Sequence, residues 1–395
     1  MEQIKGQYIG NKLSGNMKIV VIFWFVTLGI IFVSCTKPYM PEVTTINNNL
    51  LVVEGHINVG SDSTIITLSR TQLISDKNKN RPEIGAVVTV ESDANDKYVL
   101  PEKSPGKYAA PALNLSVTKK YRLSIRTTKS VTYLSDFVEA KITPPIDSLN
   151  YQVMQNGVQL FVNTHDDDNQ SIYYRWNYTE TWEFFSAYYS FLIWKGNTMQ
   201  QRDIINNDIS RCWGTNSNSP ITLGSTAKLG RDIVYNGPLT FLNSDSEKLS
   251  SKYSILVRQY ALTKDAYEFW EELKKNTESL GSIFDPQPSQ IGGNIHNVAN
   301  ANEPVIGYVS AGTFQEKRIF ILKDKLPPWR TTAPFDCLIP DTVLVPNFKA
   351  AFESGLSVPL IEVVNANGNP GVAAGPRACV DCTLRGTNKR PTFWQ

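Results

Sequence analysis

Short runs of β-branched and aromatic residues recur along most of this chain and constrain its fold more than any other feature. Clusters of Gly, Pro, Asn, Asp and Ser separate the runs, which is typical of short strands joined by turns. In the first part of the chain they fall at residues 50–57, 64–69, 86–91, 97–100, 121–126 and 132–135. About 95 residues is the size of one immunoglobulin-like module, so residues 50–143 predict a first β-sandwich.

A second group of strand-like runs predicts a second β-sandwich over residues 144–326. Its runs fall at residues 158–162, 172–181, 253–262, 305–311 and 318–322. The clearest helix of the chain lies within this module, at residues 263–280, where Thr263 can cap the first turn and Gly281 ends the helix. Its apolar positions follow the i, i+3, i+4, i+7 spacing of one helix face, which predicts packing on the sandwich. They are Ala266, Phe269, Trp270 and Leu273.

The amino terminus has the features of a secretory signal peptide. Lys18 precedes fifteen uncharged residues at 19–33, and a helix of that length spans ~22 Å, less than the ~30 Å hydrocarbon core of a bilayer. The sequence Phe32-Val33-Ser34-Cys35 resembles the bacterial lipobox, whose cysteine is acylated and becomes the new amino terminus. We therefore expect residues 1–34 to be an extension plus signal peptide and residues 35–49 a tether lipidated at Cys35. The alternative is an uncleaved anchor with an ordinary cysteine.

Four cysteines remain after Cys35, and an even number in an oxidising compartment predicts two disulfides. Cys379 and Cys382 are expected to pair with other cysteines rather than with each other. Their spacing also fits half of a zinc site or a redox pair, which stays open as an alternative. Repeated prolines predict a loop-rich tail at residues 327–395, stabilised by these disulfides and packed on the second module. The four candidates are Cys212, Cys337, Cys379 and Cys382.

Aromatic residues are concentrated between residues 173 and 194. Tyr174, Trp176 and Tyr178 alternate with polar residues, as in a strand that turns one face to the core. The alternation stops after residue 181, and the aromatic side chains beyond it are a candidate interaction surface. This surface comprises Trp182, Phe184, Phe185, Tyr188, Tyr189, Phe191 and Trp194.

The acidic run Asp166, Asp167 and Asp168 is a weak candidate for calcium binding. It lacks the glycine and the distal glutamate of an EF-hand loop, so a solvated turn is the favoured interpretation. We expect no metal site and no cofactor.

Catalytic sequence motifs are missing from the chain. It contains no H-E-x-x-H, G-x-S-x-G, Walker or post-strand G-x-G-x-x-G motif and has only three histidines, so we expect a non-enzymatic protein. Lys and Arg number 39 against 37 for Asp and Glu. No clustered basic stripe is present, which argues against a nucleic-acid partner.

Several motifs together resemble one family. They include the lipobox, the opening strand at residues 53–57, the stretch at 143–149, the Asp285-Pro286-Gln287-Pro288 turn and the terminal segment from Cys379 to Trp394. The chain resembles a Bacteroidota outer-membrane lipoprotein family known only as a domain of unknown function and commonly encoded beside TonB-dependent receptors. The resemblance implies a lipid-anchored accessory or ligand-binding protein of the cell outer membrane that partners a TonB-dependent transporter. An anchored glycan or peptide hydrolase and an envelope adhesin or spacer are the alternatives.

Overall fold

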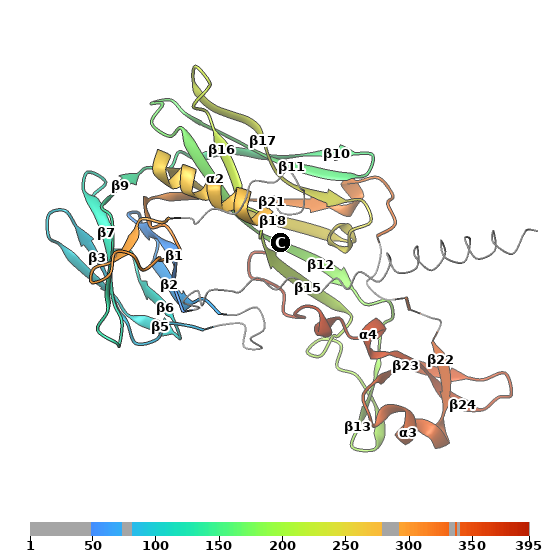
Figure 1. Ribbon diagram of the computed structural model, residues 1–395. Helices are drawn as coiled ribbons and strands as arrows, with labels where there is room; N and C mark the ends of the chain where they lie inside the picture. The colour runs from blue at the N-terminus through green and yellow to red at the C-terminus, as the bar shows by residue number, and fades with distance from the viewer. Residues whose placement is uncertain (1–48, 73–80, 279–291, 332–335, 338–339, 395) are drawn as a thin grey trace, which may run out of the picture. The chain divides into compact units, whose positions relative to one another are not determined.

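The computed structural model describes residues 49–72, 81–278, 292–331, 336–337 and 340–394. In this part of the chain the fold is mainly β, as expected, and the strands form five sheets (Figure 1). No helix in these ranges has the length and apolar character needed to cross a membrane. Cys35, with the signal peptide and nearly all of the tether, lies outside the described residues.

The first sheet combines the segment from residue 51 to residue 141 with two strands from much later in the chain. Its order is β19-β8-β7-β9-β20-β1-β2-β6-β5, and β3 pairs with both β7 and β4. Alternate side chains of its strands, such as Leu51, Val53, Leu123 and Ile125, are buried in one shared core. The strands are β1 (Leu51–Asn58), β2 (Thr64–Arg70), β3 (Val87–Ser92), β4 (Lys97–Leu100), β5 (Glu102–Ser104), β6 (Lys107–Ala110), β7 (Lys120–Arg126), β8 (Thr132–Ser135), β9 (Val138–Lys141), β19 (Ile295–Asn297) and β20 (Ser310–Gly312).

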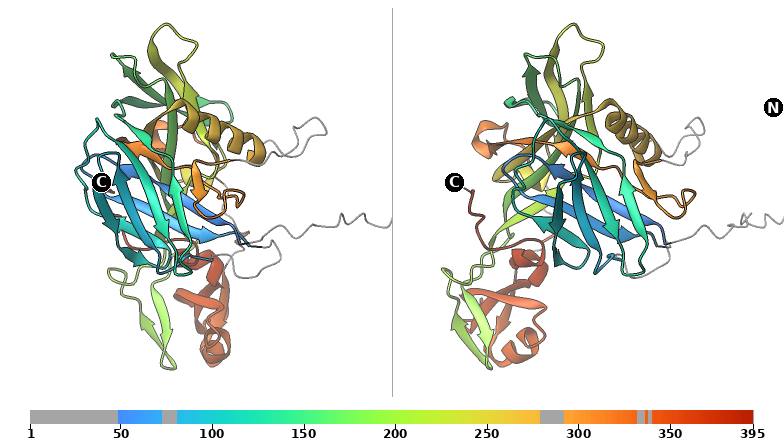
Figure 2. Two further views of the ribbon diagram at one scale, coloured as in Figure 1. Left: turned by 60° about the vertical axis from the view of Figure 1, so that its left-hand side comes forward. Right: turned by 90° about the vertical axis from the view of Figure 1, so that its left-hand side faces the viewer.

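Strand β20 lies between β9 and β1 and runs parallel to both. Figure 2 shows the orange part of the chain, which contains β20, beside the blue and cyan strands of the first sheet. A Cβ atom at Gly312 would lie 2.4 Å from the carbonyl oxygen of Lys141, so glycine is required for this close approach. The segment expected as a second-module strand at 305–311 therefore reaches the first sheet instead. Pairing between residues so distant in sequence leaves no local pattern, and the division at residue 143 does not anticipate it.

Two further sheets enclose a second core. One has the order β15-β12-β18-β21, with β16 also on β12, and the other has the order β10-β11-β17. Tyr174, Trp176 and Tyr178 are buried between them, which confirms the predicted alternation. The strands are β10 (Ile146–Met154), β11 (Gly157–Asp166), β12 (Tyr173–Phe185), β15 (Arg211–Ser217), β16 (Thr222–Ser225), β17 (Asp232–Asn243), β18 (Lys252–Leu262) and β21 (Phe314–Leu322).

The predicted helix is α2 (Lys264–Glu278), which packs against the outer face of β12 and β18 (Figure 1). The hydroxyl of Thr263 accepts a hydrogen bond from the backbone N–H of Ala266 at 3.3 Å, as the expected cap. Ala266 and Phe269 are buried, whereas Trp270 and Leu273 are half-buried. The apolar stripe therefore packs on the sheet, as its spacing predicts.

The carboxyl-terminal tail is more regular than the loop-rich segment expected from its prolines. Three of its strands form a sheet in the order β22-β24-β23, and the hairpin β13-β14 packs against it through Leu192 and Trp194. These elements are β13 (Leu192–Lys195), β14 (Thr198–Gln201), β22 (Asp341–Leu344), β23 (Ser357–Val364), β24 (Pro370–Pro376), α3 (Phe348–Phe352) and α4 (Arg377–Val380). Short 3-10 turns lie at η1 (Glu247–Leu249), η2 (Lys323–Lys325), η3 (Val345–Asn347) and η4 (Cys382–Leu384).

Candidate functional site

Charged and aromatic side chains gather on the outer face of β12 and β18. Since side chains of a strand alternate, Arg175 and Asn177 point away from the core that holds Tyr174 and Trp176. Antiparallel pairing places Tyr260 opposite Arg175, and Arg258 opposite Asn177. The outer face of β12 and β18 is therefore polar with one aromatic ring, and the opposite face of the two strands is hydrophobic.

Helix α2 and strand β1 cover the outer face of β12 and β18, and a cavity of about 360 Å³ lies between these elements. Phe269, Trp270 and Leu273 of α2 line one side, and residues 52–56 of β1 line another. A neighbouring cavity of about 460 Å³ shares Glu54, Arg175 and Trp270 with the first. The two cavities together are called the β12 cleft below. Their volumes fall within the range of small-molecule sites.

Arg175 is the central side chain of the β12 cleft. Its guanidinium carbon lies 4.0 Å from the ring centroid of Trp270 and 5.1 Å from that of Tyr260. Its Nε is buried and has no hydrogen-bond acceptor among the residues described by the structure. Burial lowers the pKa of the guanidinium to about 10, so the group stays charged at neutral pH. The cleft therefore holds a cation that forms no ion pair with a carboxylate among the described residues.

Arg258, two residues from Tyr260 on the same strand, is held differently. Its Nε donates a hydrogen bond to Glu316 Oε1 at 2.7 Å, and its guanidinium carbon lies 4.3 Å from the ring centroid of Phe314. Because Glu316 balances its charge, Arg258 adds no net charge to the β12 cleft. Arg175, by contrast, adds one positive charge.

His56 of β1 completes one wall of the β12 cleft. Its Nε2–H donates to the carbonyl oxygen of Gly312 at 3.0 Å, and its ring centroid lies 5.1 Å from that of Tyr260. Burial lowers the pKa of the imidazole to about 4, and the positive charges of Arg175 and Arg258 act in the same direction. His56 is therefore neutral at physiological pH and serves as a hydrogen-bond donor in the wall.

The predicted aromatic interaction surface divides into two groups. Trp182, Phe184, Tyr188 and Trp194 pack into interior clusters with the disulfides, α4 and the tail sheet. The other three side chains remain exposed, and the rings of Tyr189 and Phe191 are stacked with centroids 6.4 Å apart. The exposed fractions are 41% for Phe185, 52% for Tyr189 and 44% for Phe191. We call these three residues the aromatic patch.

The acidic candidates for calcium form a hydrogen-bonded turn at the end of β11. The carboxylate of Asp166 accepts hydrogen bonds from the backbone N–H groups of Asp168 and Gln170 at 3.1 and 3.0 Å. Among the described residues, no three His, Cys, Asp or Glu side chains are grouped as metal ligands.

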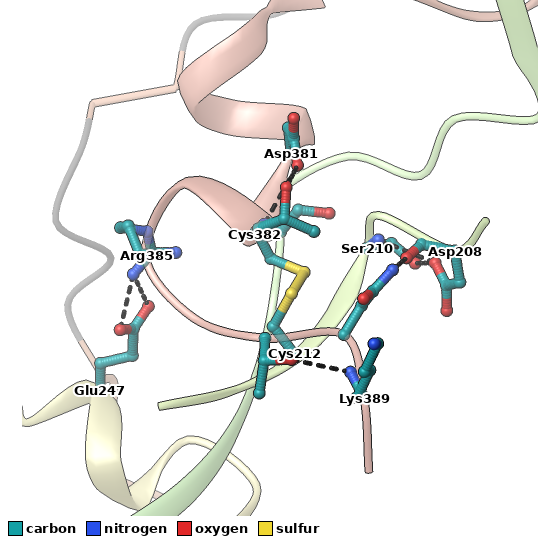
Figure 3. The surroundings of a disulfide bond; sticks show 12 residues. Asp208, Ser210, Cys212, Glu247, Asp381, Cys382, Arg385 and Lys389 are labelled. Atoms are coloured by element: carbon teal, nitrogen blue, oxygen red, sulfur yellow. Dashed lines mark hydrogen bonds and ion pairs between the residues drawn. A yellow bond between two sulfur atoms is a disulfide. The ribbon is translucent and has the colours of Figure 1, made fainter. Parts of the chain in front are cut away.

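The four candidate cysteines form two disulfides, Cys212–Cys382 and Cys337–Cys379. Cys379 and Cys382 thus pair outward, as expected. Figure 3 shows Cys212 of β15 joined to Cys382 of η4, next to an ion pair in which Arg385 Nη1 lies 2.6 Å from both oxygens of Glu247. The Cys212–Cys382 disulfide therefore attaches the tail covalently to β15, a strand of the second core's sheets.

Arg175, Arg258 and His56 were not among the site residues expected from the sequence. Arg175 was visible only as a polar residue alternating with aromatic ones, which is ordinary for a half-exposed strand. The sequence signal was an arginine between a tyrosine and a tryptophan, together with a predicted helix that carries aromatic residues on one face. That signal becomes specific only when the strand pairing and the helix position are known.

Most of this chain is similar to a known protein family. None of the curated sequences compared with the chain matches it. Among solved structures, a crystal structure of a Salmonella alpha-2-macroglobulin mutant aligns with 75% of this chain and 16% of its own chain, at 10% sequence identity and a TM-score of 0.17. Residues 36–318, which include the whole β12 cleft, match the family model "Domain of unknown function (DUF4249)", and the protein therefore belongs to this family.

Proposed function

We propose that the protein is a lipid-anchored accessory protein of the bacterial outer membrane that binds a small ligand and partners a TonB-dependent transporter, without catalysing a reaction. The anchor rests on the lipobox-like sequence ending at Cys35. The transporter partnership and the Bacteroidota origin rest on the family resemblance of the sequence. The two folded modules correspond, in this proposal, to immunoglobulin-like or fibronectin-like sandwiches.

The observation that carries the ligand-binding role is the unpaired Arg175 guanidinium in the β12 cleft. A buried charge without a counter-charge costs folding free energy, and such costs are concentrated at functional sites. The cleft combines aromatic walls with a few convergent polar groups, which is the usual composition of a small-molecule site. We propose binding rather than catalysis because recognition of a ligand needs only this one charge and the aromatic rings around it.

The aromatic patch supports a protein partner. Three exposed aromatic rings close together in sequence are the kind of side chains enriched at protein–protein interfaces. Tyr189→Ala with Phe191→Ala is expected to weaken recovery of the transporter. Tyr235, which is 80% exposed on the distant strand β17, provides a matched control as Tyr235→Ala.

The test is purification of a tagged copy from solubilised outer membranes, with mass spectrometry of the proteins that come with it. The proposal expects stoichiometric recovery of a TonB-dependent receptor with the wild-type chain. It also expects loss of membrane association for Cys35→Ala. Recovery of the correctly anchored protein alone would contradict the partnership and would favour the hydrolase or adhesin alternatives.

A further inference from the structure

Six arginines among the described residues have a carboxylate partner within 4 Å, and Arg175 is not one of them. The paired arginines are Arg70, Arg122, Arg211, Arg258, Arg377 and Arg385. Within the described residues, Arg175 makes cation–π contacts with Trp270 and Tyr260. Its cation–π contacts hold the guanidinium in one place and leave its N–H donors available to an anion.

The rest of the first cavity is mainly apolar. Phe269, Trp270, Tyr308 and Ile306 line it, and the rings of Phe269 and Tyr308 lie 5.3 Å apart. A bare inorganic anion would leave these surfaces in contact with water. An organic body attached to the anion would bury them, at a gain of roughly 25 cal/mol for each Å² of apolar area removed from water.

One carboxylate limits the charge that the ligand can carry. Glu54 lines both cavities, whereas Glu316, which lines the second cavity, is neutralised by its ion pair with Arg258. Because like charges repel in a partly desolvated site, a polyphosphate or a dicarboxylate would meet Glu54 after its first charge met Arg175. The site therefore fits a ligand with a single negative charge.

We propose that the β12 cleft binds a small organic monocarboxylate, whose carboxylate accepts hydrogen bonds from Arg175 and whose apolar or aromatic body lies against Trp270 and Phe269. This inference rests on the ligand-binding role proposed above and adds the chemical class of the ligand. A guanidinium and a carboxylate are both planar and can face each other, which favours two parallel hydrogen bonds between them. The aromatic walls then select for the body that carries the carboxylate.

The test is isothermal titration calorimetry of the full chain in detergent with phenylacetate and indole-3-acetate. Each acid is compared with its uncharged amide, and inorganic phosphate serves as the bare anion. At least one acid is expected to bind, and its amide is expected to bind at least about 10-fold more weakly, because a hydrogen bond to a charged group is lost. Arg175→Met is expected to reduce binding of the acid by about 10-fold or more. Arg318→Met, on β21 outside both cavities, is the matched control and should bind like wild type.

A second measurement separates a binding role from a structural one. If Arg175 is held for a ligand, the ligand-free Arg175→Met variant should unfold at the same temperature as wild type or a higher one, because a buried unpaired charge is removed. A lower unfolding temperature for Arg175→Met would overturn the proposal, as would equal binding of acids and amides or binding of phosphate alone. Failure of both acids to bind wild type would do the same. Since this assay needs no membrane partner, its failure is distinguishable from failure to recover a transporter.

Discussion

The neutral state of His56 makes stability of the folded protein depend on pH. Its folded-state pKa is lowered from 6.5 to about 4 by burial in the wall of the β12 cleft. As the pH falls, the unfolded chain therefore binds a proton at this residue before the folded chain does. The stability contribution of neutral His56 is present above the unfolded pKa and is lost between about pH 7 and about pH 4.

The size of this loss follows from the two pKa values. At about pH 5 an unfolded-state histidine with a pKa of 6.5 is almost entirely protonated, whereas His56 in the folded state is about nine-tenths neutral. The difference in proton binding corresponds to about 2 kcal/mol of unfolding free energy between about pH 7.5 and about pH 5. His165 acts in the opposite direction, because the hydrogen bond and charge of Asp147 raise its pKa.

Two assays measure the effect. The chain has only three histidines, so the imidazole signals can be followed by NMR, and His56 is expected to titrate about 2 units below an ordinary histidine. Urea unfolding at about pH 7.5 and about pH 5 is then compared between wild type and His56→Gln, in which a side-chain N–H donor remains. The variant should lose about 2 kcal/mol less on acidification. A His56 signal that titrates near 6.5, or the same pH dependence in both proteins, would refute the reasoning.

Two further predictions concern stability. Replacing Cys212 and Cys382 by alanine opens a closed loop of 170 residues, against 42 for the second disulfide. Loop-closure entropy gives costs of about 5 and about 4 kcal/mol, so the first variant should show the lower urea midpoint, and the reverse order would contradict the entropic argument. Lys248→Ala should destabilise the protein by about 3 kcal/mol, because Lys248 Nζ lies 2.6 Å from the buried Glu180 carboxylate, which would lose its cation. Adding Glu180→Gln should restore most of the loss in the same unfolding assay, and no restoration would argue against the ion pair as the cause.

The elements that could be predicted from the sequence are those with strong local patterns. The alternation of Tyr174 and Trp176 with polar residues located β12 and its buried face. The capping residue Thr263 and the apolar spacing after it located α2. In each case the residues that determine the structure are close together in sequence, so a short stretch of the chain contains the whole pattern.

The elements that could not be predicted depend on distant partners. Pro370 and Pro376 indicate a loop in the sequence, yet they are the first and last residues of β24. The two strands that pair with β24 come from separate segments of the tail. The β12 cleft needs β1, β18 and α2 together, and no single one of them carries a recognisable motif. Arg175 became a candidate only when strand pairing set Tyr260 beside it and the helix set Trp270 over it.

The place of β20 in the first sheet has a consequence for the order in which the chain can fold. A polypeptide is made from its amino terminus, so β1 and β9 are complete long before Ser310–Gly312 exist. Until then, the two neighbours of β20 present unpaired backbone groups toward an empty position in the sheet, and such edges are prone to pair with other chains. Vectorial synthesis therefore leaves the first sheet incomplete until about four-fifths of the chain is available, and a chain ending before residue 310 should expose an edge that a chaperone or another copy can occupy.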